Sequence, residues 1–271
     1  MKALNAGDVI LVTGATSGLG KACAERLASR GFRVYGTGRK PAASAAGGVT
    51  LLAMDVTDDA SVAGAVREIL AREGRIDGVV CNAGYGIAGS VEETPLSEAK
   101  SQFEVNFFGT LRTVRAVLPV MRAAGNGCIL VVGSMAGLAG VPYQSHYSAA
   151  KFALEGLVES LRMETRAFGI RCAVLEPGDH RTGFTDARKK SGHPGSPYAA
   201  VMERSLGVME KEERNGADPG GMARLVEKLL RKKRLRVRYM VGPGFQKLAM
   251  ILKRLLPSRA YEWIMSLYYR V

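Results

Sequence analysis

The chain has 271 residues, of which 47% are apolar and 23% charged, and its net charge is +13. This composition can bury a sizeable core and suits one large α/β domain. It lacks both an apolar run long enough to cross a bilayer and a signal-peptide pattern, so we expect a cytoplasmic protein without a membrane-spanning helix.

Short apolar runs alternate with longer helical patterns along the chain. The runs are mostly β-branched and bounded by glycine or turn residues, as is typical of strands buried on both faces. They predict strands within residues 8–14, 32–38, 48–56, 76–84, 127–134, 170–178 and 236–241. Helical patterns lie at 18–30, 58–73, 97–124, 144–168 and 218–232. This alternation predicts a single domain over residues 1–271, with a doubly wound, Rossmann-type, seven-stranded parallel sheet covered by helices on both faces.

Two segments depart from this alternation. Residues 179–217 are polar and rich in Lys, Arg, Gly and Pro, and we predict a long loop that serves as a substrate lid. Residues 243–271 predict a C-terminal extension of two amphipathic helices divided at Pro257, with Ser258 as the N-cap of the second.

The positive charge is concentrated near the C-terminus. Between Arg231 and Val271 eleven Lys and Arg residues stand against one acid, Glu262. Such an asymmetry indicates either a surface partner or a solvated basic tail. The extension therefore lies against an acidic membrane surface, caps the substrate entrance, covers a core edge or forms an oligomer interface. No nucleic-acid module accompanies the charge, so no nucleic-acid partner is expected. The four cysteines lie far apart in apolar runs and predict reduced core thiols rather than a metal site.

The first strand leads into a glycine-rich turn, Thr13-Gly14-x-x-x-Gly18-x-Gly20, that opens a helix. Side chains on such a turn would block a pyrophosphate from the backbone N–H groups at the helix N-terminus, which favours a dinucleotide site. After the second strand, Gly38 stands where an acid would bind the ribose 2′-hydroxyl of NAD. Arg39 offers positive charge for a 2′-phosphate, so NADP(H) is the preferred cofactor and NAD(H) the alternative.

Taken together, these motifs resemble the short-chain dehydrogenase/reductase family over roughly residues 7–180. Asn82-Ala83-Gly84 looks like its "NAG" motif, and Pro177-Gly178 with Thr182 like its nicotinamide-side segment. The residues "GDHR" at 178–181 depart from the apolar residues often found there. The resemblance, with the turn above, implies a cofactor site made of Gly14, Thr16, Ser17, Gly18, Leu19, Gly20, Arg39, Asp55, Val56, Asn82, Ala83, Gly84, Tyr147, Lys151, Pro177, Gly178 and Thr182.

Tyr147 and Lys151 are one helical turn apart, so they lie on the same helix face. We expect the lysine ammonium to favour the phenolate, making Tyr147 the general acid in reduction and the base in oxidation. Ser134 would hydrogen-bond the carbonyl oxygen of the substrate. The resemblance further implies that Lys151 holds the nicotinamide ribose and that Asn106 anchors a water that supplies protons to Lys151.

These residues predict an NADPH-dependent reductase of ketones or aldehydes, or a dehydrogenase of the matching alcohols in the reverse direction, acting on a hydrophobic substrate. The extension and the loop after Asn82 are more similar to family members that act on steroids, retinoids and other lipids. The alternatives are a 3-oxoacyl thioester reductase and an NADP-binding sensor or scaffold. Residues 85–95, 135–145 and 179–215 would form an apolar cavity with a basic rim. The resemblance also implies a homodimer or homotetramer that pairs through helices 97–124 and 144–168.

Overall fold

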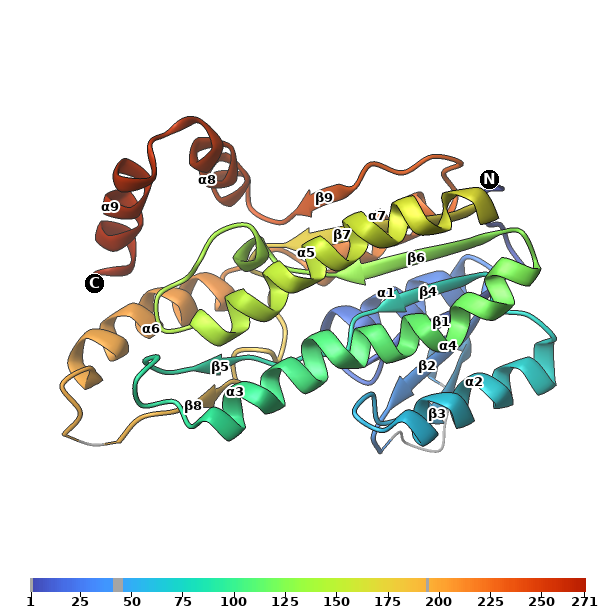
Figure 1. Ribbon diagram of the computed structural model, residues 1–271, viewed down its shortest axis with the longest axis horizontal. Coiled ribbons are helices and arrows are strands. Elements are labelled where there is room, and N and C mark those ends of the chain that lie inside the picture. The colour runs from blue at the N-terminus through green and yellow to red at the C-terminus, as the bar shows by residue number, and fades with distance from the viewer. Residues whose placement is uncertain (1, 41–45, 194) are drawn as a thin grey trace.

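The computed structural model describes residues 2–40, 46–193 and 195–271 and is built on one large parallel sheet (Figure 1). The strand order is β3-β2-β1-β4-β6-β7-β9, and every neighbouring pair is parallel. The bounds are β1 (Val9–Thr13), β2 (Arg33–Gly38), β3 (Val49–Ala53), β4 (Gly78–Cys81), β6 (Gly127–Val132), β7 (Ile170–Pro177) and β9 (Arg238–Val241). The predicted seven-stranded Rossmann-type sheet is therefore confirmed.

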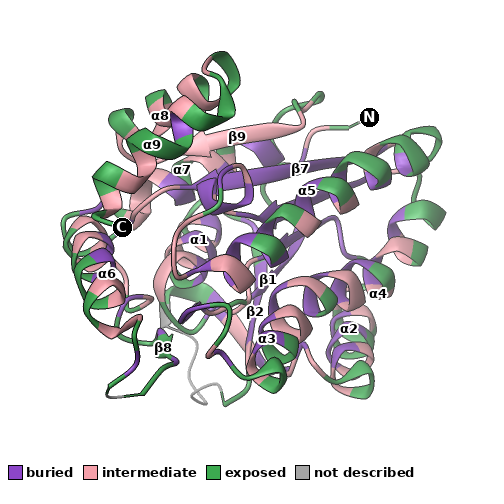
Figure 2. Ribbon diagram, turned by 60° about the vertical axis from the view of Figure 1, so that its left-hand side comes forward, coloured by how far each residue is buried: buried purple, intermediate pink, exposed green. Residues whose placement is uncertain are grey.

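Helices cover both faces of the sheet, and the sheet itself is the most deeply buried part of the molecule (Figure 2). One face carries α1 (Gly18–Ser29) and α7 (Pro219–Leu230). The other face carries α2 (Asp59–Glu73), α4 (Gly109–Ala123) and α5 (Ser145–Thr165).

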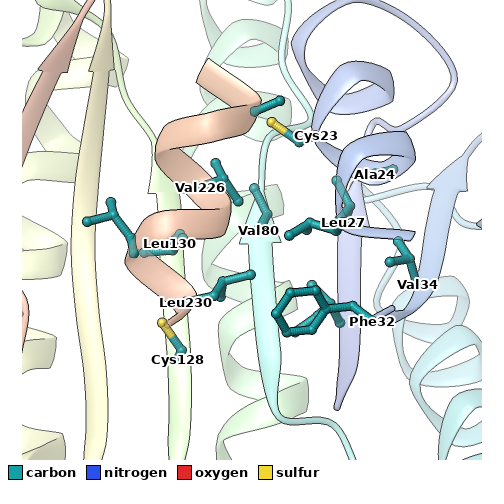
Figure 3. Close-up of a cluster of buried hydrophobic side chains, with 14 of the residues drawn as sticks. Cys23, Ala24, Leu27, Phe32, Val34, Val80, Cys128, Leu130, Val226 and Leu230 are labelled. Carbon is teal, nitrogen blue, oxygen red and sulfur yellow. The ribbon is translucent and has the colours of Figure 1, made fainter. Parts of the chain in front are cut away.

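The alternation of side chains along β1 divides the core in two. Ile10 points into the cluster under α1 and α7, whereas Leu11 points into the cluster under the other helices. In the first cluster, Leu27 of α1 and Val226 of α7 pack over Val80 of β4 (Figure 3). The four cysteines are buried and free, as predicted.

The strand order reverses direction at β1, whose two neighbours are β2 and β4. At such a switch point the connections leave toward opposite faces, and a crevice opens at the carboxyl ends of the two strands. The glycine turn after β1 and the "NAG" motif after β4 both lie at this crevice.

The helix predicted at 97–124 is interrupted by one wide turn. It consists of α3 (Leu96–Phe103), a π-helical turn (Glu104–Phe108) and α4. Such turns contain i→i+5 hydrogen bonds and occur often at functional sites. This one contains the buried Asn106.

The prediction of a long loop over residues 179–217 was wrong. This segment contains β8 (Lys189–Lys190), which pairs with β5 (Ile87–Ala88), and the helix α6 (Ala199–Arg214). The buried residues of α6 include only Ser205, Leu206 and Met209, too few apolar side chains to reveal a helical period. The helix forms because it packs against other parts of the chain, α9 among them.

The C-terminal extension forms the two predicted helices, α8 (Gly244–Leu255) and α9 (Ser258–Tyr269). They follow β9 at the edge of the sheet and lie at the same end of the molecule as α6 (Figure 1). Pro257 occupies the N-cap position of α9 and Ser258 is its first helical residue, so the cap assigned to Ser258 was wrong. In the described part of the chain, every helix is too short or too polar to span a membrane.

Candidate active site

A cavity of about 910 Å³ opens at the carboxyl ends of the central strands. Ser134, Tyr147 and Lys151 line it, and so do all the predicted cofactor residues except Gly20. Asn106 does not line the cavity. The structure therefore brings together residues that are up to about 170 positions apart in the chain, as a parallel sheet requires.

The glycine turn has the geometry that a phosphate group needs. Gly14 and Gly18 adopt positive φ angles of 65° and 54°, which residues with a Cβ rarely adopt. Gly18 faces Thr182, whose Cβ is 3.5 Å from where a Gly18 Cβ would lie. Gly20 has a different role, because a Cβ there would lie 2.2 Å from the Gly14 oxygen. Its bare backbone lets α1 pack against the turn, and the turn leaves room for a dinucleotide.

Asn82 and Thr13 fasten the glycine turn to the end of β4. The Thr13 hydroxyl accepts hydrogen bonds from the backbone N–H groups of Asn82 (2.9 Å) and Ala83 (3.0 Å). The Asn82 side-chain amide donates to the Thr13 carbonyl at 3.0 Å. The "NAG" motif thus holds the two strands of the crevice in register, and Thr13 is an organising residue that the cofactor prediction did not include.

At the adenosine end, the Asp55 carboxylate is held in its ionised form. The Thr57 backbone N–H (2.9 Å) and hydroxyl (2.7 Å) both donate to it and lower the pKa of Asp55, with a smaller contribution from Arg39. Arg39 lines the cavity beside Gly38. A Cβ at Gly38 would lie 2.5 Å from the Thr16 methyl group, so this position has no room for an acidic side chain.

The three candidate catalytic side chains come from the ends of two elements. Ser134 follows β6, and its Oγ accepts a hydrogen bond from the Ala136 backbone N–H at 3.1 Å. Tyr147 and Lys151 lie in the first turns of α5. The Lys151 Nζ is 5.7 Å from the centre of the Tyr147 ring and donates to the Val132 carbonyl at 2.8 Å.

Burial dominates the acid–base properties of this group. It raises the pKa of Tyr147 to about 12, although contact with the Ser134 side chain lowers it. It also lowers the pKa of Lys151 to about 8. The expected lowering of the Tyr147 pKa by Lys151 is not found in the protein alone, because burial is the largest influence on both groups.

Asn106 fixes the loop that follows the "NAG" motif. Its Oδ1 accepts from the Tyr85 N–H at 3.0 Å, and its Nδ2 donates to the Tyr85 carbonyl at 2.9 Å. The Asn106 carbonyl, in the π-helical turn, accepts from the Thr110 hydroxyl at 3.2 Å. The side chain is thus used in positioning backbone, and the role of Asn106 in water-mediated proton supply stays a prediction.

The far side of the cavity is built largely by α6, α8 and α9. Its mostly apolar lining includes Met209, Phe245, Ala249, Met250, Ile264, Met265, Tyr268 and Tyr269. The Phe184 ring lies 5.8 Å from the Tyr147 ring and continues this wall to the reacting group. The amphipathic pattern of the extension was visible in the sequence, but the pattern alone did not show which surface its apolar face covers.

The predicted basic rim was wrong. Where residues 85–95, 135–145 and 179–215 line the cavity, their acidic and basic side chains are His180 and the acids Asp179, Glu212 and Glu213. Arg188 forms an ion pair with Glu213 without lining the cavity. Burial lowers the pKa of His180, which favours the neutral ring.

Comparison with known proteins establishes the family. The family model described as short chain dehydrogenase matches residues 8–192. The chain belongs to the short-chain dehydrogenase/reductase family and is an oxidoreductase that acts on CH–OH or C=O groups with NAD(H) or NADP(H).

Full-length relatives agree with this assignment. A 3-ketodihydrosphingosine reductase of Bacteroides thetaiotaomicron is 42% identical over 266 residues, covering 97% of this chain and 98% of that protein. A short-chain dehydrogenase of Streptomyces avermitilis has a TM-score of 0.82 and 33% identity, with 95% of each chain covered. A short-chain dehydrogenase/reductase of Burkholderia phymatum, solved with NAD, has a TM-score of 0.80 and 26% identity over 95% of each chain.

Proposed function

We propose that the protein uses NADPH to reduce the ketone of a long-chain, apolar substrate such as 3-ketodihydrosphingosine. The observation that carries the proposal is the continuity of the cavity. Ser134, Tyr147 and Lys151 share it with an apolar wall from α6, α8 and α9. The Bacteroides relative, which resembles this chain over nearly its whole length, is named for a lipid ketone of this kind.

The acid–base state of Tyr147 suits a proton donor in reduction. Its pKa of about 12 keeps the phenol protonated at neutral pH, which is the form that donates a proton. The bound nicotinamide would supply the hydride for the carbonyl carbon. The C=O π electrons move to oxygen, Tyr147 donates its proton to that oxygen, and the product is the alcohol. Ser134 would hold the oxygen near Tyr147, since its Oγ accepts from Ala136 and its hydroxyl proton could be donated to the substrate oxygen.

The charges of the substrate wall favour an amino ketone over an acyl thioester. Asp179 and Glu212 place carboxyl groups in the cavity, and they suit an ammonium group beside the ketone. An acidic carrier or coenzyme A would meet like charge there. This supports the sphingoid ketone over the 3-oxoacyl thioester alternative.

Three features near the adenosine ribose support a preference for NADPH. Arg39 lines the cavity, its charge already acts on Asp55, and Gly38 leaves no acid to bind a free 2′-hydroxyl. Arg39 would pair with the 2′-phosphate, and Lys151 would hold the nicotinamide ribose.

The proposal is tested by measuring the turnover of a panel of substrates by the purified protein with NADPH. The panel contains 3-ketodihydrosphingosine, a ketosteroid, retinal, a 3-oxoacyl thioester and a small ketone. We expect the sphingoid ketone to be reduced best. Tyr147→Phe should lower kcat by about 10³-fold with NADPH binding retained. Preferred turnover of the thioester would favour that alternative, and NADPH binding without any turnover would favour the sensor.

The exposed face of the extension supports contact with an anionic membrane surface. Leu255 is 74% exposed, Trp263 66% and Leu267 60%, with Arg254 and Arg259 exposed on the same two helices. Apolar side chains that insert between lipids, flanked by cations that pair with anionic headgroups, are typical of interfacial helices. The other face of α8 and α9 lines the cavity, so a lipid substrate would pass from the bilayer into the site.

The long helices support self-association as a homodimer or homotetramer. Phe108, the last residue of the π-helical turn before α4, and Met163 near the end of α5 are exposed by 42% and 74%. Apolar side chains on neighbouring helices are what a symmetric pairing would bury. Light scattering after size exclusion would measure the assembly, and a monomer at micromolar concentration would contradict it.

A further inference from the structure

Glu176 is a buried acid in contact with the backbone of Ser134. It is the penultimate residue of β7 and is 0% exposed. Its Oε2 accepts a hydrogen bond from the backbone N–H of Ser134 at 2.8 Å. The neighbouring strand makes room for it, because a Cβ at Gly133 would lie 2.3 Å from the Glu176 Oε1. An acid in a fully buried strand is unusual unless it is paired or functional.

A second buried acid faces Glu176 from α5. Glu155 is one helical turn after Lys151 and 6% exposed. Its Oε2 accepts from the guanidinium of Arg238 on β9, and Arg238 also donates to the more exposed Glu159. The Oε1 atoms of Glu155 and Glu176 have no donor among the described residues. The two carboxyl groups nevertheless interact with each other.

One proton satisfies both orphan oxygens. Two carboxylates cannot hydrogen-bond to each other, because both only accept, whereas a carboxylic acid and a carboxylate can. Arg238 forms an ion pair with Glu155 and places a positive charge on that side of the pair. Burial and the charge of Glu155 raise the pKa of Glu176 well above its ordinary value, against the opposing effects of the Ser134 N–H and Lys151. The proton therefore belongs on Glu176.

We infer that Glu176, as a neutral carboxylic acid, is a positioning residue for Ser134 and Lys151. This inference rests on the proposed reduction only for its kinetic consequences. Glu176 Oε2 accepts from Ser134, and its Oε1–H donates to Glu155 Oε1, which Arg238 anchors in turn. The Ser134 backbone is thus fixed by a continuous chain of hydrogen bonds that reaches α5 and β9.

The neutral state has an electrostatic consequence for the catalytic pair. An ionised Glu176 would attract the Lys151 ammonium and raise its pKa, and it would also raise the pKa of Tyr147. While Glu176 carries a proton, it does not compete for the charge of Lys151. That charge stays available for the cofactor ribose, and the Tyr147 proton is easier to release.

Infrared spectra of the cofactor-free protein, taken as differences between the wild type and each variant, test the protonation of Glu176 without turnover. At about pH 8, where ordinary carboxyl groups are ionised, we expect the C=O stretch of a protonated carboxylic acid in the wild type. We expect this band to be absent in Glu176→Gln and retained in the control Glu164→Gln, which alters an exposed acid of α5. A wild type without the band would overturn the inference even if the protein is an active reductase.

Kinetics with NADPH and the best ketone of the panel test the positioning role. Glu176→Ala removes the acceptor of the Ser134 N–H, and kcat should fall at least about 30-fold with the KM for NADPH nearly constant. Glu176→Gln keeps one acceptor and one donor as the neutral acid does, so it should restore kcat to within about 3-fold of wild type. A Gln variant as impaired as the Ala variant would show that an ionised carboxylate is required and would overturn the inference.

Glu155→Gln provides a variant that keeps the volume of the pair, in case Glu176→Ala does not fold. A glutamine at 155 donates to Glu176 and removes the neighbouring anion, so Glu176 should ionise. The alkaline limb of the pH profile, set by Lys151 with its pKa of about 8, should then move upward. A purely structural role would leave this limb in place, so an unshifted profile would count against the positioning role.

Discussion

Asp179 and Gln246 hold each other through two hydrogen bonds that join the end of β7 to the first turn of α8. The Asp179 backbone N–H donates to the Gln246 Oε1 at 2.9 Å, and the Gln246 amide donates back to the Asp179 carboxylate. A Cβ at Gly178 would lie 2.0 Å from the same Oε1, so the close approach needs a glycine. The cavity wall formed by the extension is thereby fastened beside the candidate nicotinamide segment.

Removing this connection should loosen the substrate wall. We expect Gln246→Ala to raise the KM for the long-chain ketone several-fold and to leave the KM for a small ketone nearly unchanged. The control is Arg259→Ala, which alters an exposed residue of α9. Equal effects on the two substrates would show that the connection does not shape the distal wall.

The same connection should depend on pH. Burial raises the pKa of Asp179 to about 6, so its carboxylate is present above that value and is lost as the pH falls through it. Charge-assisted hydrogen bonds are roughly twice as strong as neutral ones. The KM effect of Gln246→Ala should therefore be larger at about pH 7.5 than at about pH 5. The measurement compares the KM for the long-chain ketone of the wild type with that of Gln246→Ala at each pH.

Reduction should decline above about pH 8, the pKa to which burial lowers Lys151. In the free protein the ammonium is lost as the pH rises through this value, whereas Tyr147, with a pKa of about 12, stays protonated. The profile of kcat/KM reports free-enzyme pKa values. Lys151→Arg keeps its charge over this range, and we expect a lower but flat profile. An unchanged alkaline limb in that variant would assign the limb to another group.

Arg39 should discriminate between the two nicotinamide cofactors. We expect Arg39→Ala to raise the KM for NADPH by about tenfold or more, since a charge-assisted phosphate contact is lost, with little change for NADH. Arg67→Ala, at an exposed position of α2, is the control for net charge. Equal losses for both cofactors would argue against a phosphate contact.

Two glycines should respond oppositely to alanine. Gly20→Ala forces a Cβ to within 2.2 Å of the Gly14 oxygen and should cost about 1–3 kcal/mol of unfolding free energy, with loss of NADPH binding. Gly207 is an exposed residue within α6, and its Cβ would meet no atom within 4 Å. Gly207→Ala should stabilise by about 0.5–1 kcal/mol. Thermal unfolding with and without NADPH measures both changes.

The extension should bring the protein to anionic vesicles. We expect the full chain to float with vesicles that contain phosphatidylserine and much less with neutral ones. Replacing Leu255 and Trp263 by serine should weaken binding about tenfold or more, because two apolar anchors are removed. Leu96→Ser on α3, whose side chain is 70% exposed, is the matched control. Full-length protein that stays with the unbound fraction would remove the membrane proposal.

Local signals explain what the sequence predicted well. The β-branched strand runs bury both faces, and the positive φ angles of Gly14 and Gly18 belong to a turn that only glycine forms easily. Properties of residues that depend on tertiary packing were harder to predict from the sequence. Leu206 and Met209 become a buried helix face only because other segments cover them, and burial rather than Lys151 sets the pKa of Tyr147.

Glu176 is a residue whose unusual environment was already visible in the sequence. It is one acid in the otherwise apolar run "CAVLEPG", where a buried strand has no place for an unpaired charge. Its partner Glu155 lies on α5 and its anchor Arg238 on β9, so the sequence could indicate the anomaly without showing which residues compensate for it.

The course of α9 determines how the protein should be handled in the laboratory. Tyr268 and Tyr269 line the cavity, and the chain ends two residues later at Val271. The N-terminal end lies at the opposite end of the molecule (Figure 1). An affinity tag fused after Val271 would sit beside the substrate entrance and depress turnover of bulky ketones, whereas a tag at the N-terminal end would lie far from the chemistry.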